Sequence, residues 1–149
     1  IILRTAWVFS ESGSNFVKTM LSLGFSRNAL SVVGDQFGGP TYAGDIAKAL
    51  VQIADRISQG DKIEYGIYHF SGLPHVSWFE FADAIFDIAI EKAIFNKKPN
   101  LTRITTEQYP TPAKRPSNSC LNTDKINNAF SIEASDWTVA LTNIRAYTG

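Results

Sequence analysis

Apolar residues change their spacing along the chain, and the changes predict alternating strands and helices. Ile1 to Phe9 starts with a continuous apolar run, as expected of a strand buried on both faces. Two further short strands are predicted at Leu30–Gly34 and Tyr65–Phe70, and Ile104 is expected in another. Strands separated by helices indicate an α/β fold, here with an α-rich second half.

Helical spacing of apolar residues predicts five helices between and after these strands. They are expected over residues 16–25, 41–57, 77–93, 123–130 and 135–144. Ser77 and Glu80 have the spacing of a capping box. Thr41 and Ser135 are interpreted as helix caps, and Ser12 to Ser14 as capping groups for the first helix.

Composition narrows the class of protein. A chain of 149 residues suits one domain with a sizeable core. Its 14 basic and 14 acidic side chains cancel, so no overall field favours nucleic acid or an acidic membrane surface. No apolar run approaches the ~20 residues of a membrane span, and no export signal is visible.

The metal-ligating and redox-active residues are few. Cys120 is the single cysteine, which excludes an internal disulfide and fits a reducing cytoplasm. His69 and His75 are too few for a metal site, and no other ligand stands at suitable spacing. We therefore expect a cytoplasmic protein without a bound metal.

The end of the first predicted strand carries an aromatic residue just before a turn and a helix. Trp7 lies at the carboxyl end of that strand, and the helix begins near Asn15. In open α/β sheets, ligands bind beyond the carboxyl ends of the strands, and a helix amino terminus suits a phosphate. Trp7 could offer its flat face to a sugar or base. Alternatively, Trp7 is a core residue and Asn15 only a cap.

Two loops combine polar groups with restricted backbone. The segment DQFGGPT contains two glycines that permit close approach of a ligand, and it adds Gln36 and Thr41. The segment YPTPAKRPSNS presents Arg115 on a stiff backbone, and a guanidinium can donate two hydrogen bonds to a diphosphate. The alternatives are an ordinary strand-to-helix connection and a solvated charged loop.

Two motifs of dinucleotide-dependent reductases are absent from the sequence. No Gly-x-Gly-x-x-Gly or Gly-x-x-Gly-x-x-Gly turn occurs. No tyrosine is followed four residues later by lysine. Taken by itself, the chain has the character of half of a larger unit.

Five stretches of the chain, in order, resemble the dTDP-4-dehydrorhamnose reductase family, part of the extended short-chain dehydrogenase/reductase group. They are ILRTAWVFSESGSNFVKTML, LSVVGDQFGGPTYAGDIA, GIYHFSG, SWFEFADAIF and YPTPAKRPSNSCLNTDKI. The resemblance extends from Ile1 to about Leu141. Several short sequence motifs that occur in the same order and at matching spacing identify a family more specifically than any single motif.

The resemblance implies reduction of the 4-keto group of dTDP-4-dehydro-β-L-rhamnose by NADPH or NADH. Family members carry the glycine-rich turn and the catalytic Tyr-x-x-x-Lys pair upstream of the position of Ile1. Residues 1–149 are therefore expected to be the carboxyl-terminal half: the last strands and helices of a Rossmann-type sheet plus a small α-rich substrate-binding lobe. No catalytic residue and no cofactor are expected on this chain, which alone should be inactive.

The resemblance also implies a dTDP-sugar site. Trp7 matches the tryptophan that packs against the deoxysugar, and Asn15 matches a position near the diphosphate. Gln36, Thr41 and Arg115 match positions in the family's sequence motifs and are expected in the same site.

Two other readings stay open. The same fold serves as the non-catalytic regulatory subunit of methionine adenosyltransferase, and extended-group relatives include sugar-nucleotide epimerases and 4,6-dehydratases. The words DQFGGPT and YPTPAKRPSNS favour a sugar-nucleotide role, and RTAWVF favours the reductase. Without its upstream neighbours, the first strand would expose an apolar edge, so we expect a homo-oligomer, a dimer formed through that edge.

Overall fold

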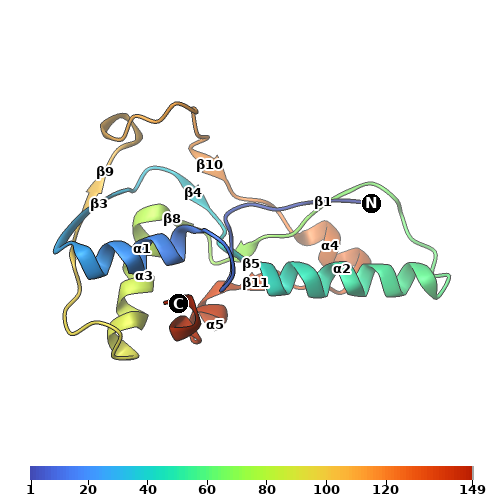
Figure 1. The fold of residues 1–149 in the computed structure, drawn as a ribbon. Coiled ribbons are helices and arrows are strands. Elements are labelled where there is room, and N and C mark those ends of the chain that lie inside the picture. Colours follow the sequence, from blue (N-terminus) through green and yellow to red (C-terminus); the bar gives the residue numbers. More distant parts are fainter. Residues whose placement is uncertain (149) are drawn as a thin grey trace.

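The computed structural model describes residues 1–148 and has two lobes joined by a crossing of short strands (Figure 1). In the sheet lobe, β1 (Ile2–Arg4) and β6 (Ile67–His69) pair in parallel, with Ile2 opposite Ile67. The helices α2 (Ala43–Ser58) and α4 (Asp124–Phe130) pack against this pair. Their contact forms a small apolar core of Ala49, Ile53, Tyr68, Phe70, Ile126, Phe130 and Ile132.

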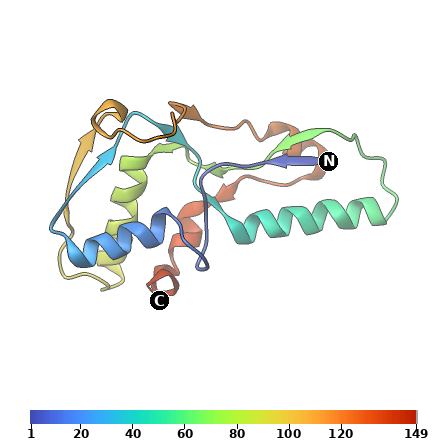
Figure 2. The same ribbon diagram turned by 45° about the horizontal axis from the view of Figure 1, so that its top comes forward.

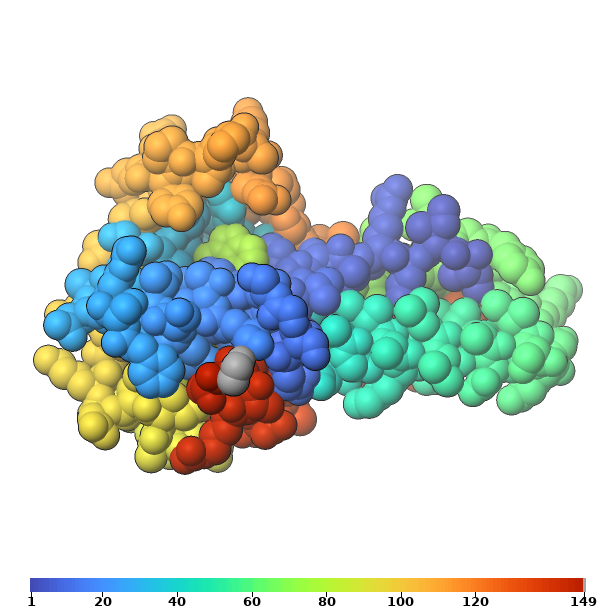
Figure 3. Space-filling model, viewed as in Figure 1, coloured from blue at the N-terminus to red at the C-terminus, as the bar shows by residue number. Residues whose placement is uncertain are grey.

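The helical lobe has its own and larger core. The parallel pair β3 (Ala29–Val33) and β9 (Asn100–Ile104) lies beside α1 (Phe16–Ser26) and α3 (Trp78–Glu91), with α5 (Trp137–Leu141) and the 3-10 helix η2 (Ile144–Tyr147). Fully buried residues of this core include Val17, Phe81, Ala82, Ile85, Phe86, Leu141 and Ile144. The same two lobes are visible in the second ribbon view and in the space-filling view (Figures 2 and 3).

Two-residue strands connect the lobes. The parallel pairs are β2 (Val8–Phe9) with β5 (Thr41–Tyr42), and β7 (Gly72–Leu73) with β11 (Ser135–Asp136). Beside them, β4 (Phe37–Gly38) lies between β8 (Val76–Ser77) and β10 (Asn118–Ser119). A side chain at Gly39 would meet the Gly72 carbonyl, and one at Gly72 would meet the Pro40 carbonyl. Only glycine therefore allows the backbones to approach this closely.

The predicted first strand, Ile1 to Phe9, is wrong as a single element. It divides into β1, which pairs with β6, and β2, which pairs with β5. The break falls at Trp7, whose φ of 50° lies in the left-handed region and cannot continue a strand. The strands predicted at Leu30–Gly34, Tyr65–Phe70 and Ile104 are confirmed as β3, β6 and β9.

The five predicted helices are present, although the last, expected to reach Ile144, ends at Leu141, and Ile144 begins η2. Three of the predicted caps are wrong. Asn15, rather than Ser12 to Ser14, caps α1, because its Oδ1 accepts the Lys18 N–H at 3.2 Å. Thr41 lies in β5, and α2 begins at Ala43 without a side-chain cap. Asp136, not Ser135, caps α5.

The capping box at the start of α3 is confirmed and fixes the position of Trp78. The Ser77 hydroxyl accepts the Glu80 N–H at 3.2 Å, and the Glu80 carboxylate accepts the Ser77 N–H at 2.7 Å. The Ser77 hydroxyl also donates to the Glu80 carboxylate at 2.8 Å. The Ser77 N–H, and after it this hydroxyl, hold the pKa of Glu80 below its ordinary value, and Arg103 adds a smaller effect.

No helix among the described residues is long and apolar enough to cross a membrane. Within residues 1–148 there is also no group of three or more metal-ligating side chains. Cys120 is half-buried, and burial raises the pKa of its thiol.

The capping box makes stability depend on pH. Because the folded pKa of Glu80 is depressed, its stabilisation is complete above the ordinary glutamic acid pKa of about 4.3 and is lost as pH falls through the lower folded value. Glu80→Gln is therefore expected to lower the free energy of unfolding by about 0.5 kcal/mol at neutral pH, since half-exposed charges are screened. Urea unfolding at neutral and strongly acidic pH should show this difference shrinking in acid. The exposed control Glu133→Gln should change little at either pH, and an unchanging Glu80→Gln difference would contradict the assignment.

Candidate sugar-nucleotide site

Thr41 holds the backbone turn at Trp7. Its N–H donates to the Trp7 carbonyl at 3.0 Å, and its hydroxyl lies 2.7 Å from the Ala6 carbonyl and 2.9 Å from the Gly39 carbonyl. The same hydroxyl accepts the Gly72 N–H at 3.1 Å. The left-handed conformation of a bulky residue costs on the order of 1 kcal/mol, so Trp7 needs such support.

The indole of Trp7 is covered on both faces. Its ring stacks on Trp78 with centroids 3.5 Å apart and planes 9° apart. A Cβ atom at Gly38 would lie 2.5 Å from Cε2 of Trp7, 2.7 Å from Nε1 and 3.0 Å from Cδ2. Because these three atoms adjoin at the ring junction, the Gly38 backbone lies over the face opposite Trp78. In this structure neither face of the Trp7 ring is fully free for a ligand ring, and its predicted sugar contact stays a prediction.

Asn15 is used mainly to shape the turn before α1. Its Nδ2 donates to the Ser10 carbonyl at 2.7 Å, while its Oδ1 caps the helix. Lys18 Nζ donates to the Glu11 carbonyl at 3.0 Å and closes the same turn. The free N–H groups of the first helical turn are therefore better placed than the Asn15 side chain to meet an anion.

A tyrosine ties this turn to the start of α2. The Tyr42 hydroxyl donates to the Glu11 carboxylate, at 2.8 Å from Oε1 and 3.1 Å from Oε2. This bond, with smaller effects of burial and nearby negative charge, raises the pKa of Tyr42. Tyr147 is 1% exposed, and its hydroxyl has no hydrogen-bond partner among the residues described. Burial, and then the charge of Glu11, raises the pKa of Tyr147 as well.

Gln36 anchors the loop that carries Arg115. Gln36 is 7% exposed, and its Nε2 donates to the Thr106 hydroxyl at 3.0 Å, in the 3-10 helix η1 (Thr106–Gln108). At the far end of the loop, the Ser117 carbonyl accepts the Phe37 N–H at 2.9 Å. Arg115 itself is exposed, and no ion pair within residues 1–148 involves it. Its guanidinium is therefore available to an anionic ligand.

The predicted residues relate in different ways to the Trp7–Trp78 stack. Thr41 bonds to Trp7, Gln36 lies two residues before Gly38, and Asn15 precedes Phe16, whose ring centroid is 4.6 Å from that of Trp78. Arg115 belongs to the loop between η1 and β10, which passes above β4 in Figure 1. Thr41 is 0% exposed and fully hydrogen-bonded, so its place in the site is to position the turn.

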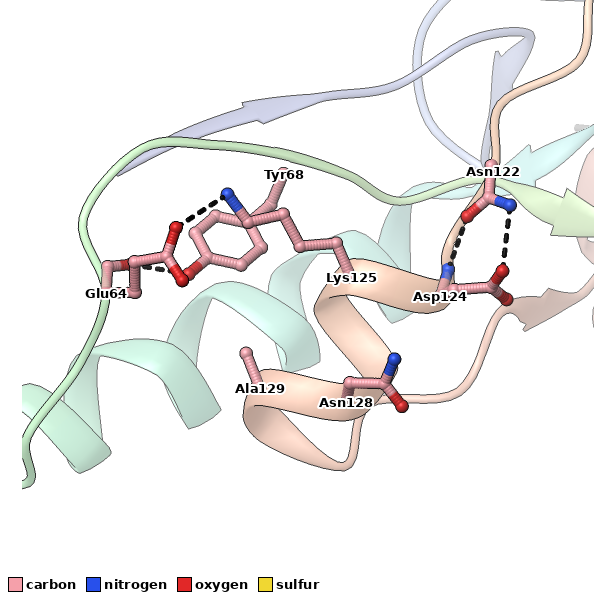
Figure 4. Close-up of a pocket in the computed structure, with 7 residues that line it drawn as sticks. All are labelled: Glu64, Tyr68, Asn122, Asp124, Lys125, Asn128 and Ala129. Atoms are coloured by element: carbon pink, nitrogen blue, oxygen red, sulfur yellow. Dashed lines mark hydrogen bonds and ion pairs between the residues drawn. The ribbon is translucent and has the colours of Figure 1, made fainter.

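A separate hollow of about 520 Å³ lies on the sheet lobe (Figure 4). Lys125 there lies 4.6 Å from the centre of the Tyr68 ring and pairs with Glu64 at 3.4 Å. Asn122 and Asp124 hydrogen-bond to each other at the start of α4. The polar groups of this hollow thus largely satisfy one another, and none of the predicted site residues lines it.

Sequence reasoning missed two members of the site. Trp78 falls within the helix predicted over residues 77–93, and Glu11 directly precedes the predicted capping groups, so neither stands out as a binding residue in the sequence. The sequence does contain one signal for Trp78, its position directly after the Ser77 cap. A residue in the first turn lies at the end of the helix, where its side chain can meet a ligand, and not within the packed face. Nothing local pointed to the bond between Glu11 and Tyr42, which are 31 residues apart.

Comparison with known proteins gives consistent matches over the whole chain. The sequence pattern of the family described as RmlD substrate binding domain matches residues 1–148. The dTDP-4-dehydrorhamnose reductase of Aggregatibacter actinomycetemcomitans is 58% identical over 147 residues, which are 99% of this chain and 50% of that protein. The reductase of Escherichia coli K12 is 38% identical, over 95% of this chain and 47% of its own length. The chain thus spans about half the length of these curated relatives.

Solved structures agree with these matches. The dTDP-4-dehydrorhamnose reductase from Bacillus anthracis, in complex with NADP, has a TM-score of 0.77 and 38% identity, covering 95% of this chain and 46% of that one. A UDP-glucuronic acid 4-epimerase from Bacillus cereus, 13% identical with a TM-score of 0.74, covers 99% of this chain and 44% of its own. At that identity the likeness to the epimerase concerns the fold alone.

The supporting part of Thr41 can be tested with an isosteric change. Thr41→Val removes the hydroxyl and leaves the buried Gly72 N–H without its acceptor. We expect a loss of about 1–3 kcal/mol in the free energy of unfolding, because an unpaired buried polar group keeps its desolvation cost. Urea denaturation measures this loss, with Thr102→Val on the exposed face of β9 as the matched control. Equal effects of the two substitutions would contradict this supporting role of the Thr41 hydroxyl.

Proposed function

The chain belongs to the RmlD substrate-binding domain family, and from this premise we propose that it is the sugar-nucleotide-binding half of a dTDP-4-dehydrorhamnose reductase. The observation that carries the proposal is the 58% identity to one such reductase over 99% of this chain. The complete protein would reduce dTDP-4-dehydro-β-L-rhamnose to dTDP-L-rhamnose in the cytoplasm. By analogy with relatives of which this chain covers 50% and 47%, its length would be about twice that of this chain.

The reductant of the complete protein would be NADPH or NADH, held outside residues 1–149. The residues of this chain do not fit a dinucleotide. Gly13 is the first glycine after β1, and no Gly-x-Gly-x-x-Gly turn of the kind that holds a pyrophosphate follows the strand. The catalytic Tyr/Lys pair would likewise come from the remainder of the protein. This half therefore binds and orients the substrate.

Three kinds of contact would hold the nucleotide sugar. The stack of Trp7 and Trp78 supplies an apolar aromatic surface beside the sugar. The amino terminus of α1, shaped by Asn15, favours a diphosphate through its free N–H groups. Arg115 would add a guanidinium to the same diphosphate, with Gln36 fixing its loop and Thr41 fixing the turn at Trp7.

The proposed binding is tested by calorimetric titration of this chain with dTDP-L-rhamnose. Arg115→Ala is expected to weaken binding about tenfold, or ~1.4 kcal/mol, because a charge-assisted hydrogen bond to the diphosphate is lost. The exposed Lys62→Ala, on the sheet lobe, is the control for a lost positive charge. Trp7→Ala should also weaken binding of the sugar nucleotide.

Two results would count against the proposal. If titration with dTDP-L-rhamnose releases or absorbs no heat, this half does not bind the sugar nucleotide. If Arg115→Ala and Lys62→Ala have equal effects, Arg115 is not part of the binding site. The same purified chain is expected not to oxidise NADPH in the presence of substrate. Turnover of NADPH by this chain would contradict the proposal that the cofactor site and the catalytic pair lie in the remainder of the protein.

We further propose that this chain by itself forms a dimer through β1. Within residues 1–148, β1 is hydrogen-bonded along one edge only, to β6. Ile2 on this strand is 60% exposed, and Leu50 and Val51 on α2 are 50% and 60% exposed. An unpaired apolar strand edge is a template for another strand, which in the complete reductase would belong to the same polypeptide.

A charge on the free edge should prevent this association. Light scattering of the wild-type chain at high micromolar concentration is expected to give the mass of a dimer, and Ile2→Lys that of a monomer. Val139→Lys places the same charge at an exposed apolar position of α5 and should leave the dimer intact. A monomeric wild-type chain would refute the proposal.

A further inference from the structure

We infer that Trp78 is a second sugar-binding residue, which closes on Trp7 in the free protein and receives the sugar ring between the two indoles. This inference rests on the proposed function. It follows from the covering of Trp7 on both faces, by Gly38 and by Trp78. A sugar ring can stack on a full face of Trp7 only if one of these two neighbours gives way.

Gly38 cannot be the neighbour that moves. It belongs to β4, where Gly38 is paired with Val76 on one side and with Ser119 on the other. Its backbone is therefore held from both edges of a three-stranded sheet. Any shift away from Trp7 would break ladder hydrogen bonds on both sides.

Trp7 is also fixed. Its carbonyl accepts the Thr41 N–H, and the preceding Ala6 carbonyl lies 2.7 Å from the buried Thr41 hydroxyl. Its left-handed φ of 50° is thus held by a residue that has no exposed surface. The Trp7 backbone is therefore held, and the Gly38 backbone against its ring restricts rotation of the side chain.

Trp78 is the side that can move. It is the first residue of α3, so its backbone is fixed by the Ser77–Glu80 box while its side chain lies half-buried at the helix end. Its remaining aromatic neighbour, Phe16, meets it at a tilt of 47° and does not lock it as a parallel stack would. Rotation about the side-chain bonds can open the stack without breaking a backbone hydrogen bond. The opened pair would then hold the sugar between two flat apolar faces.

The stacked pair provides a direct spectroscopic readout. The chain has three tryptophans, and Trp137 lies in the core with its Nε1–H bonded to the Pro74 carbonyl at 2.9 Å. An exciton couplet in the far-ultraviolet circular dichroism of the free protein must therefore come from Trp7 and Trp78. It should vanish in Trp78→Phe and persist in Trp137→Phe.

Titration then separates the sugar from the nucleotide. dTDP-L-rhamnose is expected to reduce the couplet by at least about half, because stacked chromophores couple strongly only at short range, whereas dTDP should leave it unchanged. By calorimetry, Trp78→Leu should weaken dTDP-L-rhamnose about three- to tenfold and leave dTDP binding unaltered. A purely structural Trp78 would weaken both ligands equally.

The outcomes separate this inference from the proposed function. If dTDP-L-rhamnose binds but leaves the couplet unchanged, the inference is overturned and the proposed function stands. Equal weakening of both ligands by Trp78→Leu also overturns it. If neither ligand binds the wild-type chain, the binding role of this half and the inference fail together.

Discussion

The buried hydroxyl of Thr41 is the interaction on which the rest of the structure depends. It lies where segments of both lobes cross, and it is bonded to the turn at Trp7, to the Gly39 carbonyl and to the Gly72 N–H. In a low-dielectric interior such a network is stabilising only when every member has its partner. The two apolar cores are separate, so this polar crossing fixes how the lobes are joined.

Much of the fold could be predicted from the sequence, because its helices are amphipathic and locally consistent. Five helices and three strands follow from apolar spacing, and the Ser77–Glu80 box follows from two residue types three positions apart. The break in the first strand could not be predicted. Trp7 adopts a left-handed φ because of a partner 34 residues away, and no local pattern records such a constraint. The two-residue strands in DQFGGPT escape prediction for the same reason.

The sequence can propose members of the site, but it does not give their geometry. The resemblance to a family selected Trp7, Asn15, Gln36, Thr41 and Arg115, of which Thr41 is hydrogen-bonded to Trp7. It could not distinguish a residue that faces a ligand from one that supports it. Thr41 is enclosed and Arg115 is exposed, although both were selected on equal grounds. That distinction depends on burial, which only the assembled chain determines.

The close approach of Gly39 and Gly72 has a consequence for affinity. Because bare backbone meets bare backbone there, the lobes cannot slide past each other without collision. The groups that surround Trp7 are consequently in register before any ligand arrives, and their ordering entropy is lost during folding and not during association. Apart from the proposed rotation of one indole, the proposed site would be preorganised, and its selectivity would arise from shape and not from induced order.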